Sequence, residues 1–432
     1  MTPQLDLLLY ERWRQIAAAQ RSELALVESG SGAKWTFGQL ASAESGGNDP
    51  GPVCFPQGVN AQFVLGVLRA WRLNRVVCPL EPAQILPAIG EPPAGIVHLK
   101  STSASTGAAR LVAFTAPQLA ADVDNIVATM GLRPGWPNLG VISLAHSYGF
   151  SNLVLPLLLH GIPLILVETP LPETVRRTAA GWSALTLAAV PALWRAWHDA
   201  EAIPANVRLA ISAGAPLPPA LEETVFKTHG LKLHNFYGAT ECGGIAYDAS
   251  ERPRSDGALA GTPLHNVRLA QANDGCLEIH SPAVGETYWP TPAENLRAGV
   301  YRTSDLTELK GAEVYLRGRA GDLINVAGRK VSPETIECAL AAHPAVNECL
   351  VFGAPSADEQ RVESIVACLA TRAAVTDHEL KQFLLEQLPG WQLPREFWFV
   401  DSLAVNQRGK LSRVEWRARY LAARPPGVSQ PR

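Results

Sequence analysis

Five consecutive residues, Tyr237 to Glu241, combine side chains that could act together on one nucleotide. The ring of Tyr237 can stack on a flat base, and the hydroxyl of Thr240 can hydrogen-bond a phosphate oxygen. The carboxylate of Glu241 suits Mg²⁺ held jointly with phosphates, and Gly238 lets the backbone turn without steric penalty. An apolar strand that ends in a glycine turn has a similar pattern, so the stretch alone leaves both interpretations open.

A second stretch, Thr102 to Thr106, is rich in small hydroxyl residues and precedes Gly107. Small hydroxyl side chains and exposed backbone N–H groups can wrap a polyphosphate. The stretch is not a Walker loop, because the pattern Gly-x-x-x-x-Gly-Lys-[Ser/Thr] is absent. A solvated turn is the alternative, and the position of the stretch directly after a predicted strand favours phosphate binding.

The elements that must position these side chains alternate between strands and helices. Alternating stretches of the two kinds are predicted at 53–56, 60–71, 75–80, 139–144, 184–190 and 207–213. This alternation predicts an α/β fold with a parallel sheet and crossover helices. Four turns follow predicted strands, namely 101–107, 145–149, 212–216 and 237–241. Because ligands of open α/β sheets bind outside the carboxyl ends of the strands, we expect these turns to form one pocket.

Length and composition bound the class of protein. The 432 residues suggest two or three domains, and 47% hydrophobic with 18% charged residues is typical of a folded globular chain. Thirty-seven Lys+Arg against 40 Asp+Glu give a net charge of −3, without a long run of one sign. We therefore expect no nucleic acid partner and no polybasic membrane patch.

The cysteines and the apolar stretches favour a cytoplasmic location. Seven scattered cysteines, never spaced as Cys-x-x-Cys, favour reduced thiols over a zinc site or a disulfide framework. The N-terminal stretch lacks a basic start and a long apolar centre, which argues against a signal peptide. Prolines, a histidine and a glycine interrupt the longest apolar passage, 151–167, which predicts a buried helix and a strand instead of a membrane span.

After residue 255 the predicted elements are short strands and turns. Gly, Arg and Asp residues open a new hydrophobic pattern near 317–322, which predicts a domain boundary. We expect a large N-terminal domain over 1–317, with mostly parallel sheets, flanking helices and a small β-region. A small mobile α+β domain is predicted over 318–423, and the tail 424–432 is predicted to be disordered.

Seven motifs give the chain a resemblance to the adenylate-forming (AMP-binding) family of acyl-CoA synthetases, aryl-acid ligases, adenylation domains and luciferase. Each motif is weak alone, but together they follow the family's order over nearly the whole chain. They are the phosphate loop 102–107, the pocket segment 146–149, the adenine-contacting turn 213–217, the Tyr-Gly-x-Thr-Glu motif 237–241, the ribose motif 301–305, the hinge region 318–337 and the lysine-bearing segment 406–413.

The resemblance implies a two-step reaction that uses ATP and Mg²⁺. The carboxylate of an acid attacks the α-phosphorus and releases pyrophosphate, and the acyl-adenylate then passes to the thiol of coenzyme A or of carrier-protein phosphopantetheine. The implied catalytic residues are Lys410, Glu241, Thr240 and His146, with Glu241 as the metal ligand. The implied ATP- and AMP-binding residues are Thr102, Ser103, Ser105, Thr106, Gly107, Gly214, Ala215, Pro216, Phe236, Tyr237, Gly238, Asp305 and Arg319.

The implied roles agree with the chemistry of the side chains. Attack of one anion on another requires neutralisation and alignment, so positioning and electrostatics should dominate. Asp305 can accept both ribose hydroxyls, with Arg319 assisting. Lys410 suits a bridge between the substrate carboxylate and the α-phosphate, because a lysine is a compact cation on a flexible stem. A solvated surface lysine is the alternative for Lys410 taken alone.

The acid and thiol sites are implied by the same resemblance. The acyl pocket would contain His146, Ser147, Tyr148, Ala213, Gly214, Cys242 and Gly243. Rotation about Gly321 and Asp322 would remove Lys410 and present a thiol-acceptor face with Gly328 and Lys330. Amino-acid-activating relatives carry an aspartate in the pocket segment, and this chain does not, so a fatty or aromatic acid is expected.

Three departures from the family pattern support a second hypothesis. Ala104 replaces a glycine of the phosphate loop, and Gly321 replaces the usual Asp or Lys of the hinge. The first subdomain also looks abridged, with few residues between Thr36 and Val53. These features motivate a catalytically weak adenylate-binding or carrier-protein-binding module as the alternative function.

Overall fold

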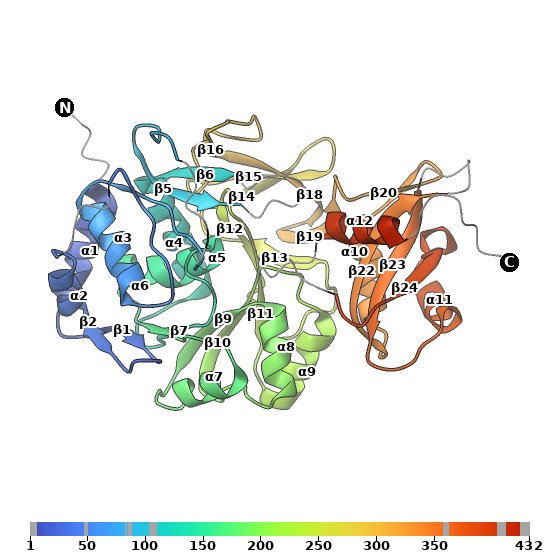
Figure 1. Ribbon diagram of the computed structural model, residues 1–432, viewed down its shortest axis with the longest axis horizontal. Coiled ribbons are helices and arrows are strands. Elements are labelled where there is room, and N and C mark those ends of the chain that lie inside the picture. Colours follow the sequence, from blue (N-terminus) through green and yellow to red (C-terminus); the bar gives the residue numbers. More distant parts are fainter. Residues whose placement is uncertain are drawn as a thin grey trace.

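The computed structural model describes residues 7–46, 51–82, 84, 89–102, 110–356, 363–403 and 412–423. Figure 1 shows a large domain that begins at the N-terminus and a small domain, coloured orange to red, at the other end of the molecule. The predicted α/β fold with a large N-terminal and a small C-terminal domain is confirmed. No helix in these ranges is long and apolar enough to cross a membrane.

A mixed sheet, fourteen-stranded over the described residues, forms the centre of the large domain. Its strands in spatial order are β14 (Arg268–Gln271), β15 (Cys276–His280), β18 (Val300–Lys310), β19 (Glu313–Arg319), β13 (Leu259–Pro263), β12 (Gly243–Tyr247), β11 (Leu233–Ala239), β10 (Val207–Ser212), β9 (Leu185–Ala189), β7 (Asn138–Gly140), β8 (Leu164–Leu166), β1 (Leu24–Glu28) and β2 (Lys34–Thr36), and β17 (Leu296–Arg297) pairs with β18. Pairing is parallel from β1 through β8, β7, β9 and β10 to β11, and antiparallel beyond it.

Helices cover both faces of the parallel part of this sheet. The first layer is α7 (Pro172–Ala179), α8 (Pro191–Asp199) and α9 (Pro219–His229). The second layer is α1 (Leu8–Ala19), α5 (Ser147–Gly149), η2 (Phe150–Val154) and α6 (Leu155–His160). Trp194 and Trp197 of α8 are buried in one core, and Trp13 and Phe150 are buried in the other. All five residues of β9 are buried, as expected for a strand covered on both faces.

A second sheet packs beside the first and is also part of the large domain. Its strands in order are β16 (Thr287–Trp289), β6 (Leu111–Thr115), β5 (Ile96–Ser101), β4 (Val76–Val77) and β3 (Val53–Cys54). The helix α3 (Ala61–Arg72) contacts β3 and β4, and α4 (Ala116–Met130) contacts β5 and β6, whereas α2 (Phe37–Ala43) packs against β1 and β2 of the first sheet. Helix α4 begins directly after Thr115, which forms a capping box with Gln118.

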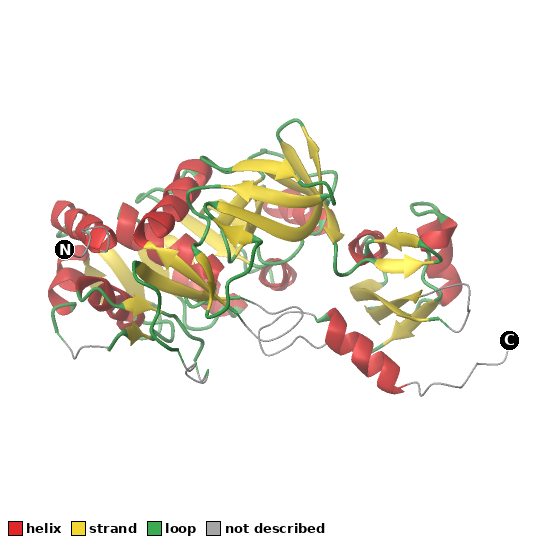
Figure 2. Cartoon of the chain, turned by 90° about the horizontal axis from the view of Figure 1, so that it is seen from above, coloured by secondary structure: helices red, strands yellow, loops and turns green. Residues whose placement is uncertain are grey.

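The small domain has its own sheet and its own cores. The hairpin β20 (Ile324–Val326) and β21 (Arg329–Val331) precedes α10 (Pro333–Ala341), β22 (Val346–Pro355), β23 (Glu363–Thr371), α11 (Asp377–Leu385), η3 (Gly390–Gln392), β24 (Glu396–Phe399) and α12 (Arg413–Ala423). Figure 2 shows these elements as a separate body beside the large domain, and α10 is in contact with β19. Pro333 opens α10 as predicted, because proline lacks only an N–H that has no partner in a first turn.

Three local predictions were wrong in detail. The stretch 237–241 was expected to be a turn, but its first three residues continue strand β11. Asp305 was expected just past a strand, but it lies inside β18. The alternation at 34–37 predicts a strand, which β2 confirms for its first three residues, and the composition from residue 42 predicts a loop, but residues 37–43 form α2.

Candidate active site

A chain of hydrogen bonds joins three of the predicted nucleotide-binding residues. The phenol of Tyr237 donates to Asp305 Oδ2 at 2.5 Å, and Arg319 Nε donates to Asp305 Oδ1 at 2.9 Å. Strand pairing explains the second contact, since Asp305 on β18 lies directly opposite Arg319 on β19. Burial, followed by the charge of Asp305, raises the pKa of Tyr237 well above its ordinary value. The phenol therefore stays protonated and donates.

Glu241 lies at the end of the same motif, where the chain turns from β11 into β12. Its Oε1 accepts a hydrogen bond from the phenol of Tyr288 at 2.9 Å, and its backbone carbonyl accepts one from Gly285 at 2.8 Å. Burial raises the pKa of Glu241, and the bond from Tyr288 only partly offsets that effect. Tyr288 belongs to β16, and the guanidinium carbon of Arg110 lies 3.9 Å from the centroid of its ring. The hydrogen bond from Tyr288 therefore joins Glu241 to the sheet whose strand β5 precedes the phosphate loop.

Glu241 is the carboxylate of this motif that could hold Mg²⁺. The described ranges contain no group of three or more His, Cys, Asp and Glu residues that could hold a metal ion. Mg²⁺ is commonly bound by one or two carboxylates together with substrate phosphates. The hydrogen bond from Tyr288 uses one lone pair of Glu241 Oε1, and each carboxylate oxygen has two, so the residues present fit a metal that is shared with a nucleotide.

The glycine turn after Glu241 rests on a buried ion pair that sequence reasoning missed. Asp122 on α4 accepts hydrogen bonds from Gly244 N at 3.3 Å and Ser151 Oγ at 2.6 Å, and Lys100 Nζ lies 3.3 Å from it. A Cβ at Gly243 would lie 1.9 Å from Asp122 Oδ1, and Gly243 also has a φ of +69°. Any side chain there would displace the carboxylate, so the turn requires glycine.

The predicted adenine turn follows β10, the strand next to β11. Gly214 has a φ of +84°, a value that L-residues rarely adopt, and Ala215 and Pro216 are exposed beside it. Ser212 at the end of β10 pairs with Asn235, so this turn leaves the sheet next to Phe236 and Tyr237. The structure therefore brings the adenine turn and the Tyr-Gly-x-Thr-Glu motif together at the carboxyl edge of the parallel strands.

The predicted acyl pocket segment lies beside the same strand ends. Tyr148 donates to the carbonyl of Ile211 at 3.4 Å, and its ring centroid lies 6.0 Å from that of Phe236. His146 Nε2 lies 3.1 Å from Glu81 Oε1, a partner that the sequence did not indicate. Ser147 opens α5, while Ala213 and Cys242 are buried in the core. These residues thus come from three segments that are far apart in the chain.

Some predicted residues are placed less fully. Ser103, Ala104, Ser105, Thr106, Gly107 and Lys410 lie outside the described residues. Thr102 and Arg110 exchange backbone and side-chain hydrogen bonds, so the residues at which the chain enters and leaves the phosphate segment lie side by side. Thr240 and Gly238 flank Ala239, the last residue of β11.

The predicted hinge and acceptor residues lie at the start of the small domain. A Cβ at Gly321 would meet no atom within 4 Å, and Asp322 Oδ2 accepts a hydrogen bond from Arg413 at 2.9 Å. Gly328 has a φ of +82° in the β20–β21 turn, and Lys330 on β21 is exposed.

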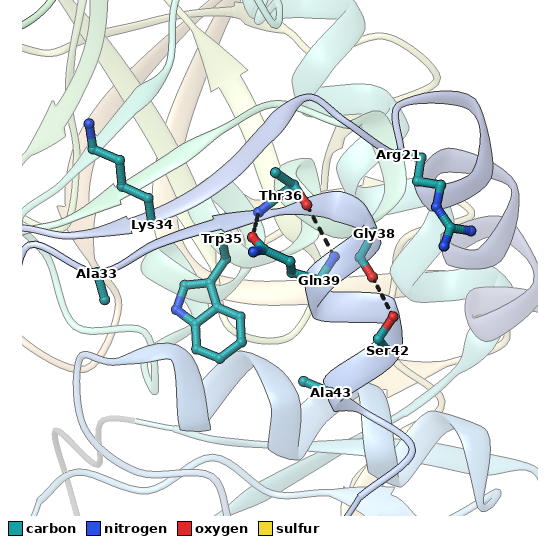
Figure 3. A pocket seen from close by; sticks show the side chains of 9 residues that line it. All are labelled: Arg21, Ala33, Lys34, Trp35, Thr36, Gly38, Gln39, Ser42 and Ala43. Atoms are coloured by element: carbon teal, nitrogen blue, oxygen red, sulfur yellow. Dashed lines mark hydrogen bonds between the residues drawn. The ribbon is translucent and has the colours of Figure 1, made fainter.

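A hollow on the surface of the first subdomain lies away from these residues. It is lined by Arg21, Ala33, Lys34, Trp35, Thr36, Gly38, Gln39, Ser42 and Ala43, at β2 and α2 (Figure 3). None of them belongs to a predicted motif, and the hydrogen bonds drawn there cap and extend α2. We therefore assign this hollow no part in the chemistry.

The fold and this set of side chains define an adenylate-forming enzyme. The family model described as AMP-binding enzyme matches residues 70–292, and the model of the AMP-binding enzyme C-terminal domain matches residues 335–410. The chain belongs to the AMP-binding enzyme family.

Curated relatives and solved structures agree with this membership. The chain is similar to an anthranilate–CoA ligase of Pseudomonas aeruginosa, with 29% identity over 75% of this chain and 67% of the relative. It is also similar to the fatty acid–[acyl-carrier-protein] ligase ScoC of Streptomyces coeruleorubidus, with 31% identity over 54% of this chain and 50% of the relative. The o-succinylbenzoate CoA synthetase of Bacillus subtilis, solved with its acyl-adenylate intermediate, shares the fold with a TM-score of 0.83 at 20% identity, over 94% of this chain and 97% of that one.

These findings confirm the predicted class of reaction. The chain is an AMP-forming acid–thiol ligase, which activates a carboxylic acid with ATP as an acyl-adenylate and transfers the acyl group to a thiol.

Proposed function

We propose that the ends of β11, β18 and β19 bind the nucleotide, with Tyr237 against the adenine and Asp305 on the ribose hydroxyls. The Tyr237–Asp305–Arg319 chain of hydrogen bonds carries this proposal, because residues from separate motifs meet there within 2.9 Å. Each carboxylate oxygen has a second lone pair, so Asp305 can accept ribose hydroxyls without releasing its protein partners. Gly214, Ala215, Pro216, Phe236 and Gly238 complete this side of the site.

The phosphates are proposed to lie between Glu241 and the segment that starts at Thr102. Thr240 and the hydroxyls of Ser103, Ser105 and Thr106 would donate to phosphate oxygens. Mg²⁺ bound to Glu241 would neutralise phosphate charge. The raised pKa of Glu241 supports this role, because a buried carboxylate gains most from a nearby cation.

The first step forms a bond between an oxygen of the acid and the α-phosphorus. The bond from the α-phosphorus to the oxygen that bridges to the β-phosphate breaks, and pyrophosphate leaves. Lys410 is proposed to bridge the two anions during this attack, where charge stabilisation matters most. In the second step a thiol attacks the acyl carbon and AMP leaves.

We infer that the acid is aromatic or aliphatic and enters beside His146, Ser147 and Tyr148. The other side would be lined by Cys242 and by the small residues Ala213, Gly214 and Gly243. A residue larger than glycine at position 243 would collide with Asp122. The first relative named above acts on anthranilate and the second on a fatty acid, which supports both classes of acid. Their names also give coenzyme A and an acyl carrier protein as the two candidate acceptors.

Domain alternation is proposed to separate the two steps. The large domain would span 1–317 and the small one 318–423, with Gly321 and Asp322 as the hinge. A glycine at position 321 restricts the backbone less than the usual Asp or Lys would, which is compatible with a hinge there. The turned small domain would present Gly328 and Lys330 to the thiol. The seven free cysteines support a cytoplasmic enzyme.

Pyrophosphate release over a panel of aromatic and fatty acids tests this function. The panel is run with coenzyme A and, separately, with a holo carrier protein. We expect release with at least one acid and thioester formation with one acceptor. Nucleotide binding without release for every acid would instead support the weak binding module suggested by Ala104 and Gly321.

The role of Lys410 is tested with a matched pair of lysine variants. Lys410→Ala should lose adenylation by a thousandfold or more, on the order of a lost charge-stabilising group, and retain AMP binding. Lys227→Ala removes an exposed lysine paired with Glu223 and should leave both unchanged. Equal turnover in the two variants would contradict the assignment.

A further inference from the structure

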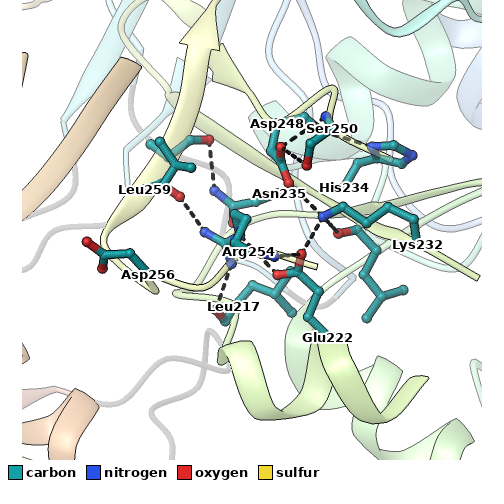
Figure 4. A network of polar contacts seen from close by, with 12 residues as sticks. Leu217, Glu222, Lys232, His234, Asn235, Asp248, Ser250, Arg254, Asp256 and Leu259 are labelled. Carbon is teal, nitrogen blue, oxygen red and sulfur yellow. Dashed lines mark hydrogen bonds and ion pairs between the residues drawn. The ribbon is translucent and has the colours of Figure 1, made fainter. Parts of the chain in front are cut away.

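Four charged residues that belong to no motif form a closed network behind the adenine turn (Figure 4). Glu222, Lys232, Asp248 and Arg254 are at most 7% exposed. Lys232 bonds both carboxylates, to Asp248 Oδ2 at 2.6 Å and to Glu222 Oε1, and Arg254 Nε donates to Glu222 Oε2 at 3.0 Å. Two cations and two anions cancel, so the buried cluster carries no net charge.

One side of the network holds the end of the adenine turn. Arg254 donates from one terminal nitrogen to the carbonyl of Leu217 at 2.9 Å, and from the other to the carbonyl of Leu259. Leu217 follows the turn that contains Gly214, and Glu222 lies on α9, which begins directly after it. The guanidinium thus fixes the adenine turn to β13 and to the helix that continues the chain.

The other side of the network holds the start of β11. Lys232 donates to the carbonyl of Leu233 at 2.9 Å, and His234 Nδ1 lies 2.9 Å from the carbonyl of Asp248. Both contacts lie on the strand that continues to Tyr237. The network therefore connects the turn and the strand between which the adenine ring is proposed to lie, although none of its members reaches the site.

Stability alone does not explain such a cluster. Apolar side chains of similar volume often replace buried ion pairs with no loss of stability. A guanidinium, by contrast, can bond two carbonyls and a carboxylate in one fixed plane, which apolar side chains cannot do. The arrangement is suited to setting the position of backbone segments.

We propose that Arg254 is a positioning residue for the nucleotide, which fixes the adenine turn relative to Tyr237 and thereby sets the affinity for ATP and AMP. This inference rests on the proposed nucleotide site. Arg254 contacts the adenine turn at Leu217, the end away from Gly214. We therefore expect Arg254 to affect the binding of the acid and the rate of the chemical step much less than the binding of the nucleotide.

Arg254→Lys tests the proposal, because it keeps the charge and loses the planar fork. We expect KM for ATP and Kd for AMP to rise by about tenfold, the order of one hydrogen bond to a charged group. The kcat and the KM for the acid should stay within about twofold. Arg252→Lys is the matched control, since Arg252 lies on the same loop, is exposed and places its guanidinium over the ring of Phe226, and it should change none of these constants.

A charge-balanced double variant covers the case in which Arg254→Lys does not fold. Arg254→Gln combined with Glu222→Gln removes one cation and one anion together, and it should weaken AMP binding in the same direction. Unchanged AMP affinity in either folded variant, or a fall confined to kcat, would overturn the inference.

Calorimetric AMP binding separates the two proposals. If the wild-type protein binds AMP but activates no acid, the proposed function is wrong. The comparison of AMP affinities between wild type and variants still decides the role of Arg254 in that case.

Discussion

Two charged clusters in this enzyme, one in each domain, differ in charge balance and in burial. In the large domain, Glu222 and Arg254 belong to a neutral set of four that is almost completely buried. In the small domain, Arg413 faces three carboxylates and is the one cation paired with them among the described residues, with Asp322, Glu334 and Glu337 at 2.7 to 2.9 Å, and its side chain is 21% exposed. The first cluster is balanced, and the second has an excess of negative charge.

The pKa shifts follow from this difference. Burial alone would raise the pKa of Asp248, but hydrogen bonds from Lys232 and Ser250 outweigh it and lower the pKa. Burial raises the pKa of Glu337 to about 7, and Glu334 adds to the rise, because one arginine cannot satisfy every carboxylate around it. Asp248 behind the nucleotide site therefore stays ionised near neutral pH, while Glu337 at the proposed hinge gains or loses a proton there.

Removing one anion from the balanced cluster should have the largest effect. Glu222→Ala leaves Lys232 and Arg254 with a single carboxylate in a buried site. An uncompensated buried charge lowers the free energy of unfolding by about 3–5 kcal/mol. Urea denaturation measures the change. Glu223→Ala, at the next residue and in an exposed pair with Lys227, should change little, and similar losses in the two variants would contradict the special cost of removing a charge from the buried cluster.

Arg413→Met should have a smaller effect on the small domain. The variant leaves three carboxylates without their cation, but Glu337 can take up a proton instead of staying charged. We expect a loss of about 1–3 kcal/mol in the free energy of opening, measured by hydrogen exchange in β22 and β23. Arg417→Met, on the same helix and 3.6 Å from Glu363, is the control and should be nearly neutral. A loss as large as that of Glu222→Ala would contradict the argument from proton uptake.

The pH dependence of the small domain follows from the sign of the Glu337 shift. The pKa is about 7 in the fold against an ordinary 4.5, so between these values the folded chain keeps a proton that the unfolded chain has lost. Stability is then full below pH 4.5 and falls as pH rises to 7, by up to about 1.4 kcal/mol per pH unit. Hydrogen exchange across this range should show the fall in the wild type and a flatter profile in Glu337→Gln. A profile that rises with pH in the wild type alone would reverse the assigned direction.

The candidate site residues could be picked out from the sequence because side chains suited to bind one nucleotide stand close together within short motifs. Tyr237, Thr240 and Glu241 stand within one short stretch, and Asp305 and Arg319 follow in motifs of their own. The sequence thus singled out Tyr237, Asp305 and Arg319, which hydrogen bonds join in the structure. The direct pairing of Asp305 with Arg319 needed the register of β18 and β19, which no short pattern specifies. Helix α2 was missed although Thr36 and Gln39 have the spacing of a capping box.

The charged clusters were not predictable from local patterns, because their partners are scattered. Glu222 reads as one polar residue of an amphipathic helix, and Arg254 as one of several charges in a loop. The available signal was a charge among apolar neighbours, as at Lys232 between Leu231 and Leu233 or Asp122 within α4. Such a signal shows that a charge is buried, but only the fold shows with what it is paired.

Glu334→Gln is expected to have the smallest effect and to resolve the small-domain cluster most finely. The carboxylate of Glu334 attracts Arg413 at 2.9 Å and also repels Glu337, so its removal loses one favourable contact and one unfavourable contact. Ser332 can still donate to the amide oxygen, which preserves the local hydrogen bond. At pH 8 the net change in stability should be within about 0.5 kcal/mol, as for a partly exposed ion pair. The pH midpoint of the small domain should nevertheless move down, because Glu334 is one cause of the raised pKa of Glu337. A lower midpoint with unchanged stability would show that excess negative charge makes this cluster titrate, while an unmoved midpoint would leave burial as the only cause.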